Sequence, residues 1–193
     1  MIDVGQARAH AGRLPGIEGI WVLICGDLTI FTLLFGSFLH ARSSAVSEFE
    51  FGRQQLSADW GGVNTLVLLT SSWVVVRALT AARAGRAVAA RRWVSAGAAL
   101  GVVFAVSKGC EYAREVQHGF TPASSEFSMY YYSLTGIHLV HVLCGSVGST
   151  VFALVWRRAE HARGSAGFES MAIYWHMVDL LWIFLFPMLY LLS

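Results

Sequence analysis

The sequence predicts an all-α polytopic membrane protein: one bundle of five transmembrane helices. Two observations predict it. Of the 193 residues, 55% are hydrophobic and 13% are charged, which is about half the charged fraction of an ordinary soluble domain. The apolar residues also fall into five segments, each near the length that a bilayer requires, separated by short polar loops. A formal net charge of +2 is too small to indicate nucleic-acid binding.

The chain divides into an arm and a membrane domain. We expect an N-terminal arm at residues 1–16 and a single domain at 17–193, with spans near 17–41, 60–81, 93–113, 127–156 and 171–192. The arm has no apolar core of signal-peptide length, so it is expected to be retained. The second and third spans are rich in small residues, which let helix backbones approach closely in lipid, so both are expected to be packing helices. The longest loop, 42–59, is expected to have no fold of its own.

Arginine placement predicts the orientation of the bundle. The arm and the second and fourth loops hold nine arginines, whereas the first and third loops and the C-terminus hold three. Loops rich in Arg and Lys stay in the cytoplasm. The N-terminus is therefore expected to be cytoplasmic and the C-terminus periplasmic or extracellular.

The three cysteines occur singly in different spans, which favours small, buried, inert thiols.

Four of the five predicted spans carry ionisable side chains that lipid would disfavour. They are Asp27, Lys108, Glu111, His138, His141, His176 and Asp179. Counted from the inner end of each span, Asp27, His176 and Asp179 lie roughly 8–15 Å deep, and Glu111 and the two fourth-span histidines roughly 22–27 Å. We therefore expect two polar layers, with Asp27 facing the fifth span and Glu111 meeting His138 or His141. Lys108 has Glu111 as its natural helical partner three residues later.

These polar groups admit two interpretations. They could form a proton relay, an ion path or a metal site, or they could be interhelical hydrogen-bonded pairs that fix the register, each worth about 1 kcal/mol. The i, i+3 spacing of His138 and His141 would place both imidazoles near one face for haem or copper. A bis-His haem usually takes one histidine from each of two helices, however. We therefore expect no catalytic, cofactor-binding or metal-binding residue.

Three stretches of the chain resemble a known family. They are YWHMVDLLWIFLF at 174–186, LTGIHLVHVLCG at 134–145 and SKGCEYAREV at 107–116. They resemble the signature stretches of cytochrome c oxidase subunit III, the third subunit of haem-copper oxidases. Three motifs that agree in order and spacing make the resemblance specific, and it extends from Pro15 to the end of the chain. It implies five helices in place of the family's usual seven.

The resemblance implies a non-catalytic subunit in the bacterial plasma membrane. Such a subunit packs against catalytic subunit I, which with its partners carries the haem and copper of aerobic electron transport. It also binds phospholipid and is thought to shape proton uptake. Asp27 would correspond to the family's carbodiimide-reactive glutamate, shortened here by one methylene.

Two other functions remain alternatives. The opening stretch LPGIEGIWVLICGDLTIF looks more like the nitric oxide reductase E branch, which implies an accessory subunit of a nitric oxide reductase with non-haem iron in its partner. The second alternative is an independent proton-coupled transporter that uses Asp27, Glu111 and Asp179. The absence of an inverted repeat and of a Gly/Pro-broken helix pair argues against it.

Overall fold

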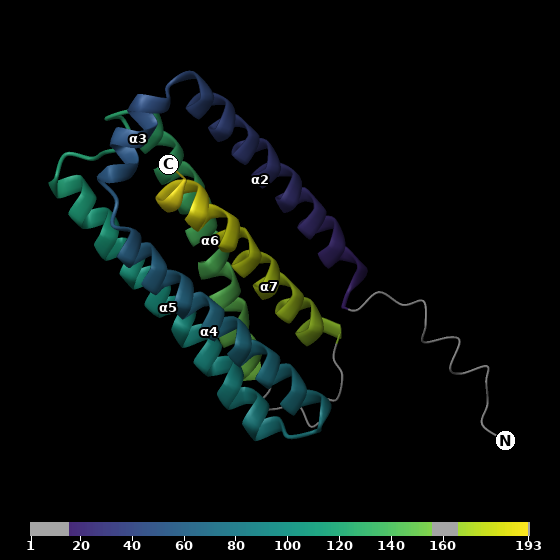
Figure 1. Cartoon of the computed structure of the whole chain (residues 1–193). Coiled ribbons are helices and arrows are strands. Elements are labelled where there is room, and N and C mark those ends of the chain that lie inside the picture. The colour runs from purple at the N-terminus through teal and green to yellow at the C-terminus, as the bar shows by residue number, and fades with distance from the viewer. Residues whose placement is uncertain (1–15, 156–165, 193) are drawn as a thin grey trace.

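The computed structural model describes residues 16–155 and 166–192, and every regular element in these ranges is helical. Five long apolar helices run alongside one another (Figure 1): α2 (Glu18–Ser44), α4 (Ala58–Arg83), α5 (Ala87–Gln117), α6 (Glu126–Val155) and α7 (Ala166–Phe186). The short helix α3 (Val46–Gln54) joins α2 to α4, and the π-helix η1 (Pro187–Leu191) continues α7. The predicted five spanning helices are confirmed. Residue 156, the predicted end of the fourth span, and residues 1–15 of the arm lie outside the described ranges.

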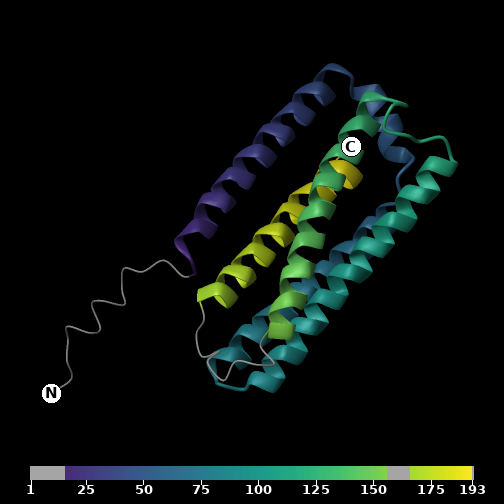
Figure 2. The same cartoon turned by 180° about the vertical axis from the view of Figure 1, so that it is seen from behind.

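Helices α4 to α7 form the bundle, and α2 lies along one side of it (Figures 1 and 2). In the most apolar stretch of each helix, 50% of the residues of α7 are buried, against 17% of those of α2. Helix α7 is therefore the centre of the bundle, whereas α2 leaves most of its surface for lipid or another protein. The length and composition of the five helices make the chain a multi-pass membrane protein.

The helices alternate in direction, so the connections gather at two ends. The start of α2, the α4–α5 connection and the start of α7 lie at one end, and α3, the α5–α6 connection and η1 lie at the other (Figure 1). The backbone N–H of Ile17 donates to Ser170 Oγ at 2.8 Å and ties the start of α2 to the start of α7. Four arginines, at 83, 86, 91 and 92, are in or next to the α4–α5 connection. The assignment of this end to the cytoplasm stays a prediction.

Close approach of α5 to its neighbours depends on glycine. Ser71 Oγ of α4 donates to the Gly97 carbonyl of α5 at 3.2 Å. A Cβ atom at Gly101 would lie 2.3 Å from Ser146 Oγ and 2.9 Å from the Trp175 ring, so no side chain fits there without displacing them. The expectation that the second and third spans pack through small residues is confirmed by these contacts.

The structure adds a short helix to the longest loop and corrects one expectation about the cysteines. The loop, expected to have no fold of its own, contains α3, which is anchored by the buried Phe49: its ring meets Phe38 at 5.4 Å and Phe127 at 5.7 Å between centroids. Three aromatic rings supply enough burial to order a nine-residue helix that would be marginal alone. The cysteines, expected to be buried, are exposed on the outward faces of their helices.

Candidate functional site

A fully buried lysine organises the polar interior between α5, α6 and η1. The Lys108 side chain is 0% exposed. Its Nζ donates to Glu111 Oε2 at 3.1 Å, to the Tyr131 hydroxyl at 3.1 Å and to the Tyr190 hydroxyl at 2.6 Å. An ammonium group has three N–H donors, so each has a partner. The predicted pairing of Lys108 with Glu111 is confirmed.

Glu111 closes this cluster. Its Oε1 accepts hydrogen bonds from the hydroxyls of Tyr131, at 2.9 Å, and Tyr190. Rings from Tyr112, Tyr131, Tyr190 and Trp182 surround the ammonium at 4.6 to 5.5 Å from Nζ to each centroid. The positive charge therefore has an ionised partner and aromatic faces around it, the arrangement that makes a buried charge tolerable. We call Lys108, Glu111, Tyr131 and Tyr190 the lysine cluster.

The C-terminal π-helix brings Tyr190 into this cluster. Pro187 has no backbone N–H, so α7 cannot continue regularly beyond Phe186, and the chain continues as η1. The end of η1 is held from the other side, since Arg53 Nη1 of α3 donates to the Tyr190 carbonyl at 3.3 Å. Arg42 Nη2 donates to the Leu192 carbonyl at 3.4 Å. Two arginines thus satisfy carbonyls at a helix C-terminus, where positive charge is favourable.

Arg53 also forms an ion pair within α3. Its Nε donates to Glu50 Oε2 at 3.1 Å, and its Nη2 contacts Glu50 Oε1. Hydrogen bonds from Arg53 and then from Gln54 lower the pKa of the Glu50 carboxyl below its usual value. The pair lies in the connection between two spanning helices. It orients Arg53 toward the end of the chain.

Asp27 of α2 and His141 of α6 form a second polar contact, nearer the surface. Asp27 Oδ2 lies 3.3 Å from His141 Nε2, and their side chains are 19% and 18% exposed. His141 Nδ1 lies 2.8 Å from the Ile137 carbonyl, which can only accept, so Nδ1 carries a hydrogen. Nε2 and Oδ2 then form a hydrogen bond when one proton lies between them, whether that proton is bound to the nitrogen or to the oxygen. The pair can hold that proton on nitrogen or on oxygen at unchanged total charge.

His138 connects α6 to α7. It is 0% exposed, and its Nε2 lies 3.1 Å from the Val178 carbonyl, to which it donates. Its ring packs against Trp182 at 5.0 Å and Phe104 at 5.6 Å between centroids. His138 and His141 therefore face different neighbours and do not converge on one ligand. Within residues 16–155 and 166–192, no group of three His, Cys, Asp or Glu side chains could hold a metal ion.

His176 and Asp179 of α7 both face α4. His176 Nδ1 lies 2.7 Å from Ser72 Oγ. The Asp179 carboxyl is buried, at 4% exposure, and neither of its oxygens has a hydrogen-bond partner among the described residues. Ser72 is close to this carboxyl, but the geometry does not make a hydrogen bond between them. Both side chains thus point into the bundle.

The two predicted polar layers were wrong in their pairings. Helix α2 does pack against α7, so Asp27 lies near the fifth span as expected, but the ion pair of Asp27 is with His141 of the fourth span. Glu111 pairs with Lys108 and two tyrosines and with neither histidine. The prediction counted depth in the membrane from the inner end of each helix. That count is valid only if the helices are parallel and begin at the same depth. These helices range from 21 residues in α7 to 31 in α5, and α6 is tilted against α7 (Figure 2).

Sequence reasoning also missed the tyrosines of the lysine cluster. Tyr131 belongs to a tyrosine run that is typical of an interfacial aromatic belt, yet it is 0% exposed. A signal was present: Tyr131, Thr135 and His138 follow i, i+4, i+7 spacing and so share a helical face with a polar residue already singled out. No such signal marks Tyr190, whose position depends on the π-helix.

Comparisons with known proteins agree over nearly the whole chain. A family model described as cytochrome c oxidase subunit III matches residues 15–193. The cytochrome c oxidase subunit 3 of Synechocystis sp. is 30% identical over 97% of this chain and 81% of its own. That of Corynebacterium diphtheriae is 30% identical over 89% of this chain and 85% of its own. The cytochrome bo(3) ubiquinol oxidase subunit 3 of Pseudomonas aeruginosa is 26% identical over 99% of this chain and 92% of its own.

Proposed function

Because the chain belongs to the cytochrome c oxidase subunit III family, we propose that it is a non-catalytic subunit of a haem-copper respiratory oxidase. The family match over residues 15–193 carries this proposal. Its partner is the catalytic subunit I, and the haem and copper belong to partner subunits. Its location is the plasma membrane of a bacterium, with the N-terminus in the cytoplasm.

The interior of the bundle supports a structural role for this subunit. Each donor of Lys108 and each oxygen of Glu111 has a partner inside the chain. A saturated cluster binds no further ligand and passes no ion without first breaking its own hydrogen bonds. This favours a rigid helical body that covers and stabilises a catalytic subunit over an independent transporter. The exposed surface of α2 is available to lipid and to that partner.

The Asp27–His141 pair is the group best placed to influence proton uptake. It is partly exposed, whereas the lysine cluster is enclosed. A partly exposed carboxyl–imidazole pair can also take up a proton from its surroundings and release it again, and this exchange with the surroundings, unlike transfer within the pair, can supply protons locally. We propose this as the contribution of the chain to proton delivery, together with phospholipid bound along its helices.

Replacing Asp27 by Asn in the assembled complex tests the proton role. The variant keeps the shape of the side chain and removes its titratable oxygen. The pH profile of turnover should shift while haem content stays constant, and Asp27→Glu, which keeps a carboxyl, should restore the profile. An unchanged pH profile in Asp27→Asn would exclude the proton role and leave the subunit role intact.

A nitric oxide reductase is the second candidate partner. The Gly-Asp pair at Gly26 and Asp27, together with the stretch that contains it, favours this assignment. The two partners differ in their metals, since a reductase would contribute non-haem iron and no copper. Metal analysis of the purified complex therefore distinguishes the two: copper supports the oxidase, and non-haem iron without copper supports the reductase.

A further inference from the structure

Three buried side chains between α4 and α7 carry polar atoms that have no hydrogen-bond partner among the described residues. They are Asn64 of α4, at 0% exposure, and Trp175 and Asp179 of α7, at 3% and 4%. The atoms are Nδ2 and Oδ1 of Asn64, Nε1 of Trp175 and both carboxyl oxygens of Asp179. Buried polar groups are nearly always hydrogen-bonded in folded proteins, because an unpaired group has lost its bonds to bulk water and gained none in return. These atoms therefore need a partner that the described side chains do not supply.

Two hydrogen bonds between α4 and α7 fix the position of Asp179 along the interface of these helices. Ser72 Oγ lies 2.7 Å from His176 Nδ1, and Trp182 Nε1 donates to Thr65 Oγ1 at 2.9 Å. Residue numbers rise along α7 from the first contact to the second and fall along α4, so the two helices are antiparallel. Asp179 lies midway between the two contacts on α7, and its carboxyl is close to Ser72.

The other two side chains flank Asp179. Asn64 immediately precedes Thr65 and so lies about one helical turn beyond Asp179. Trp175 lies one turn before Asp179 on the same face of α7, and its ring packs against Val75 of α4. The unpartnered atoms thus fall within roughly 12 Å along the bundle.

The mixture of donors and acceptors identifies the class of ligand. Trp175 Nε1 can only donate a hydrogen bond, and the Asn64 amide needs both an acceptor and a donor. The Asp179 carboxyl accepts hydrogen bonds whether or not it carries a proton. A metal cation would serve the acceptors alone and an anion the donors alone, whereas water donates and accepts and so serves both kinds.

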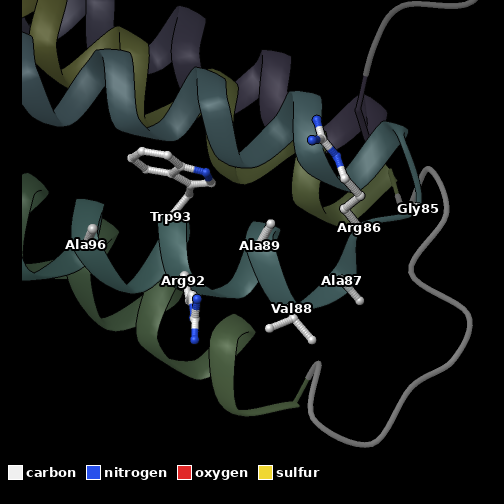
Figure 3. A pocket seen from close by; sticks show the side chains of 8 residues that line it. All are labelled: Gly85, Arg86, Ala87, Val88, Ala89, Arg92, Trp93 and Ala96. Carbon is white, nitrogen blue, oxygen red and sulfur yellow. The ribbon is translucent and has the colours of Figure 1, made fainter.

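Solvent in the surface pocket of the α4–α5 hairpin does not supply these bonds. That pocket is lined by residues 85–89, 92, 93 and 96, in the connection and the first turns of α5 (Figure 3). None of the three unpartnered side chains lines it. Because these side chains are at most 4% exposed, water that bonds to them is enclosed by the bundle.

We propose that ordered water molecules occupy the interface of α4 and α7 and bridge Asn64, Asp179 and Trp175. The waters complete the hydrogen bonds of these side chains and join the two helices where the side chains do not bond to each other directly. A bridging water is enthalpically nearly as good as a direct hydrogen bond, so the waters stabilise this contact. The site belongs to the chain itself and does not depend on which respiratory complex the chain joins.

Hydroxyl-radical footprinting of the full-length chain with synchrotron X-rays tests the site, because the radicals form from water and oxidise the side chains that this water contacts. Tyr131 is the internal control, since it is 0% exposed and its hydroxyl is bonded within the lysine cluster. After division by the rate of the free amino acid, oxidation of Trp175 should be severalfold faster than that of Tyr131. In a brief mix with water labelled with heavy oxygen, incorporation of the label at Trp175 should lag behind that at exposed side chains, because enclosed water exchanges slowly.

Two substitutions of Asp179 separate bound water from packing. Asp179→Leu removes both acceptors between Asn64 and Trp175, so oxidation of Trp175 should fall toward the rate of Tyr131. Asp179→Asn is the matched control: it keeps a polar side chain that bonds to water, so oxidation of Trp175 should stay near the wild-type rate. If Asp179→Leu does not fold, the comparison of Trp175 with Tyr131 in the wild type still decides whether water is held there.

Three results would overturn the site. Equal oxidation rates of Trp175 and Tyr131 in the wild type would mean that no water contacts Trp175. Oxidation of Trp175 at the wild-type rate in Asp179→Leu would mean that the water does not depend on the polar side chains. Incorporation of heavy oxygen at Trp175 as fast as at exposed side chains would mean that bulk water enters through transient opening of the bundle.

Discussion

Replacement of Glu111 should lower the unfolding free energy more than replacement of any other residue of the polar interior. Glu111→Leu removes hydrogen bonds to three side chains and leaves the Lys108 charge in an enclosed site without an opposite charge. Leaving one member of a buried ion pair alone costs about 3–5 kcal/mol. We expect the variant to lose that much unfolding free energy, measured by denaturant titration of the purified protein.

Two further variants identify the cause of that loss. In Lys108→Leu with Glu111→Leu no buried charge remains, so most of the lost stability should return. Asp179→Leu removes another buried acid, but one without a hydrogen-bond partner in the described ranges, so its effect should be small. If the double variant were less stable than Glu111→Leu, the loss in Glu111→Leu could not be due to the unpaired charge of Lys108.

The sequence predicted residue pairs within a helix better than pairs between helices. Lys108 and Glu111 were paired correctly because three residues along a helix fix their separation. Asp27 and His141 were not paired, because their contact joins two different helices, α2 and α6, whose relative placement no local spacing encodes. The candidate residues were thus found, but most of their partners were not.

Two glycines of α5 provide a matched test of helix packing. A Cβ atom at Gly101 would lie 2.9 Å from the buried ring of Trp175, whereas at Gly109 it would meet nothing within 4 Å. Gly101→Ala should therefore lower stability by about 1–3 kcal/mol through overpacking. Gly109→Ala should raise stability by up to about 1 kcal/mol, because alanine favours the helix. Thermal melting of both variants measures the difference, and equal shifts would contradict the packing described here.

Arg53 should hold the C-terminal π-helix in place. Arg53→Gln removes the bonds to Glu50 and to the Tyr190 carbonyl, so hydrogen exchange at Leu192, whose N–H donates to Pro187, should accelerate. The pKa of Glu50 is lowered in the folded state. The contribution of the ion pair is therefore present at neutral pH and lost as the pH falls through that lowered pKa. The difference in exchange rate at Leu192 between Arg53→Gln and the wild type should become smaller over the same fall in pH.

Arg114→Gln is the control for that experiment. Arg114 is exposed near the C-terminal end of α5, and among the described residues it forms no hydrogen bond or ion pair with η1, so exchange at Leu192 should stay at the wild-type rate. Equal acceleration in both variants would mean that loss of any positive charge loosens this end.

The sequence predicted the five long helices but neither of the short elements, α3 and η1. Apolar length identified the five spans, since only a helix satisfies its own backbone in lipid. Helix α3 was missed because a nine-residue segment has little apolar length, and its order comes from contacts of Phe49 with distant aromatic rings. The π-helix was not predicted because Pro187 alone indicates only that a regular helix is interrupted.

At the scale of the whole molecule, the bundle has one enclosed side and one open side. The lysine cluster and His138 hold α5, α6, α7 and η1 together, while α2 contributes few buried residues. Family membership and this asymmetry agree with a subunit that is complete in its core and meets a partner through its outer surface.

Affinity purification of the tagged full-length chain from gently solubilised membranes tests the proposed partnership most directly. The copurified material is examined by its reduced-minus-oxidised visible spectrum. We expect haem absorbance that follows the chain in a constant ratio through successive purification steps. A chain recovered in folded form and free of haem at every step would contradict it.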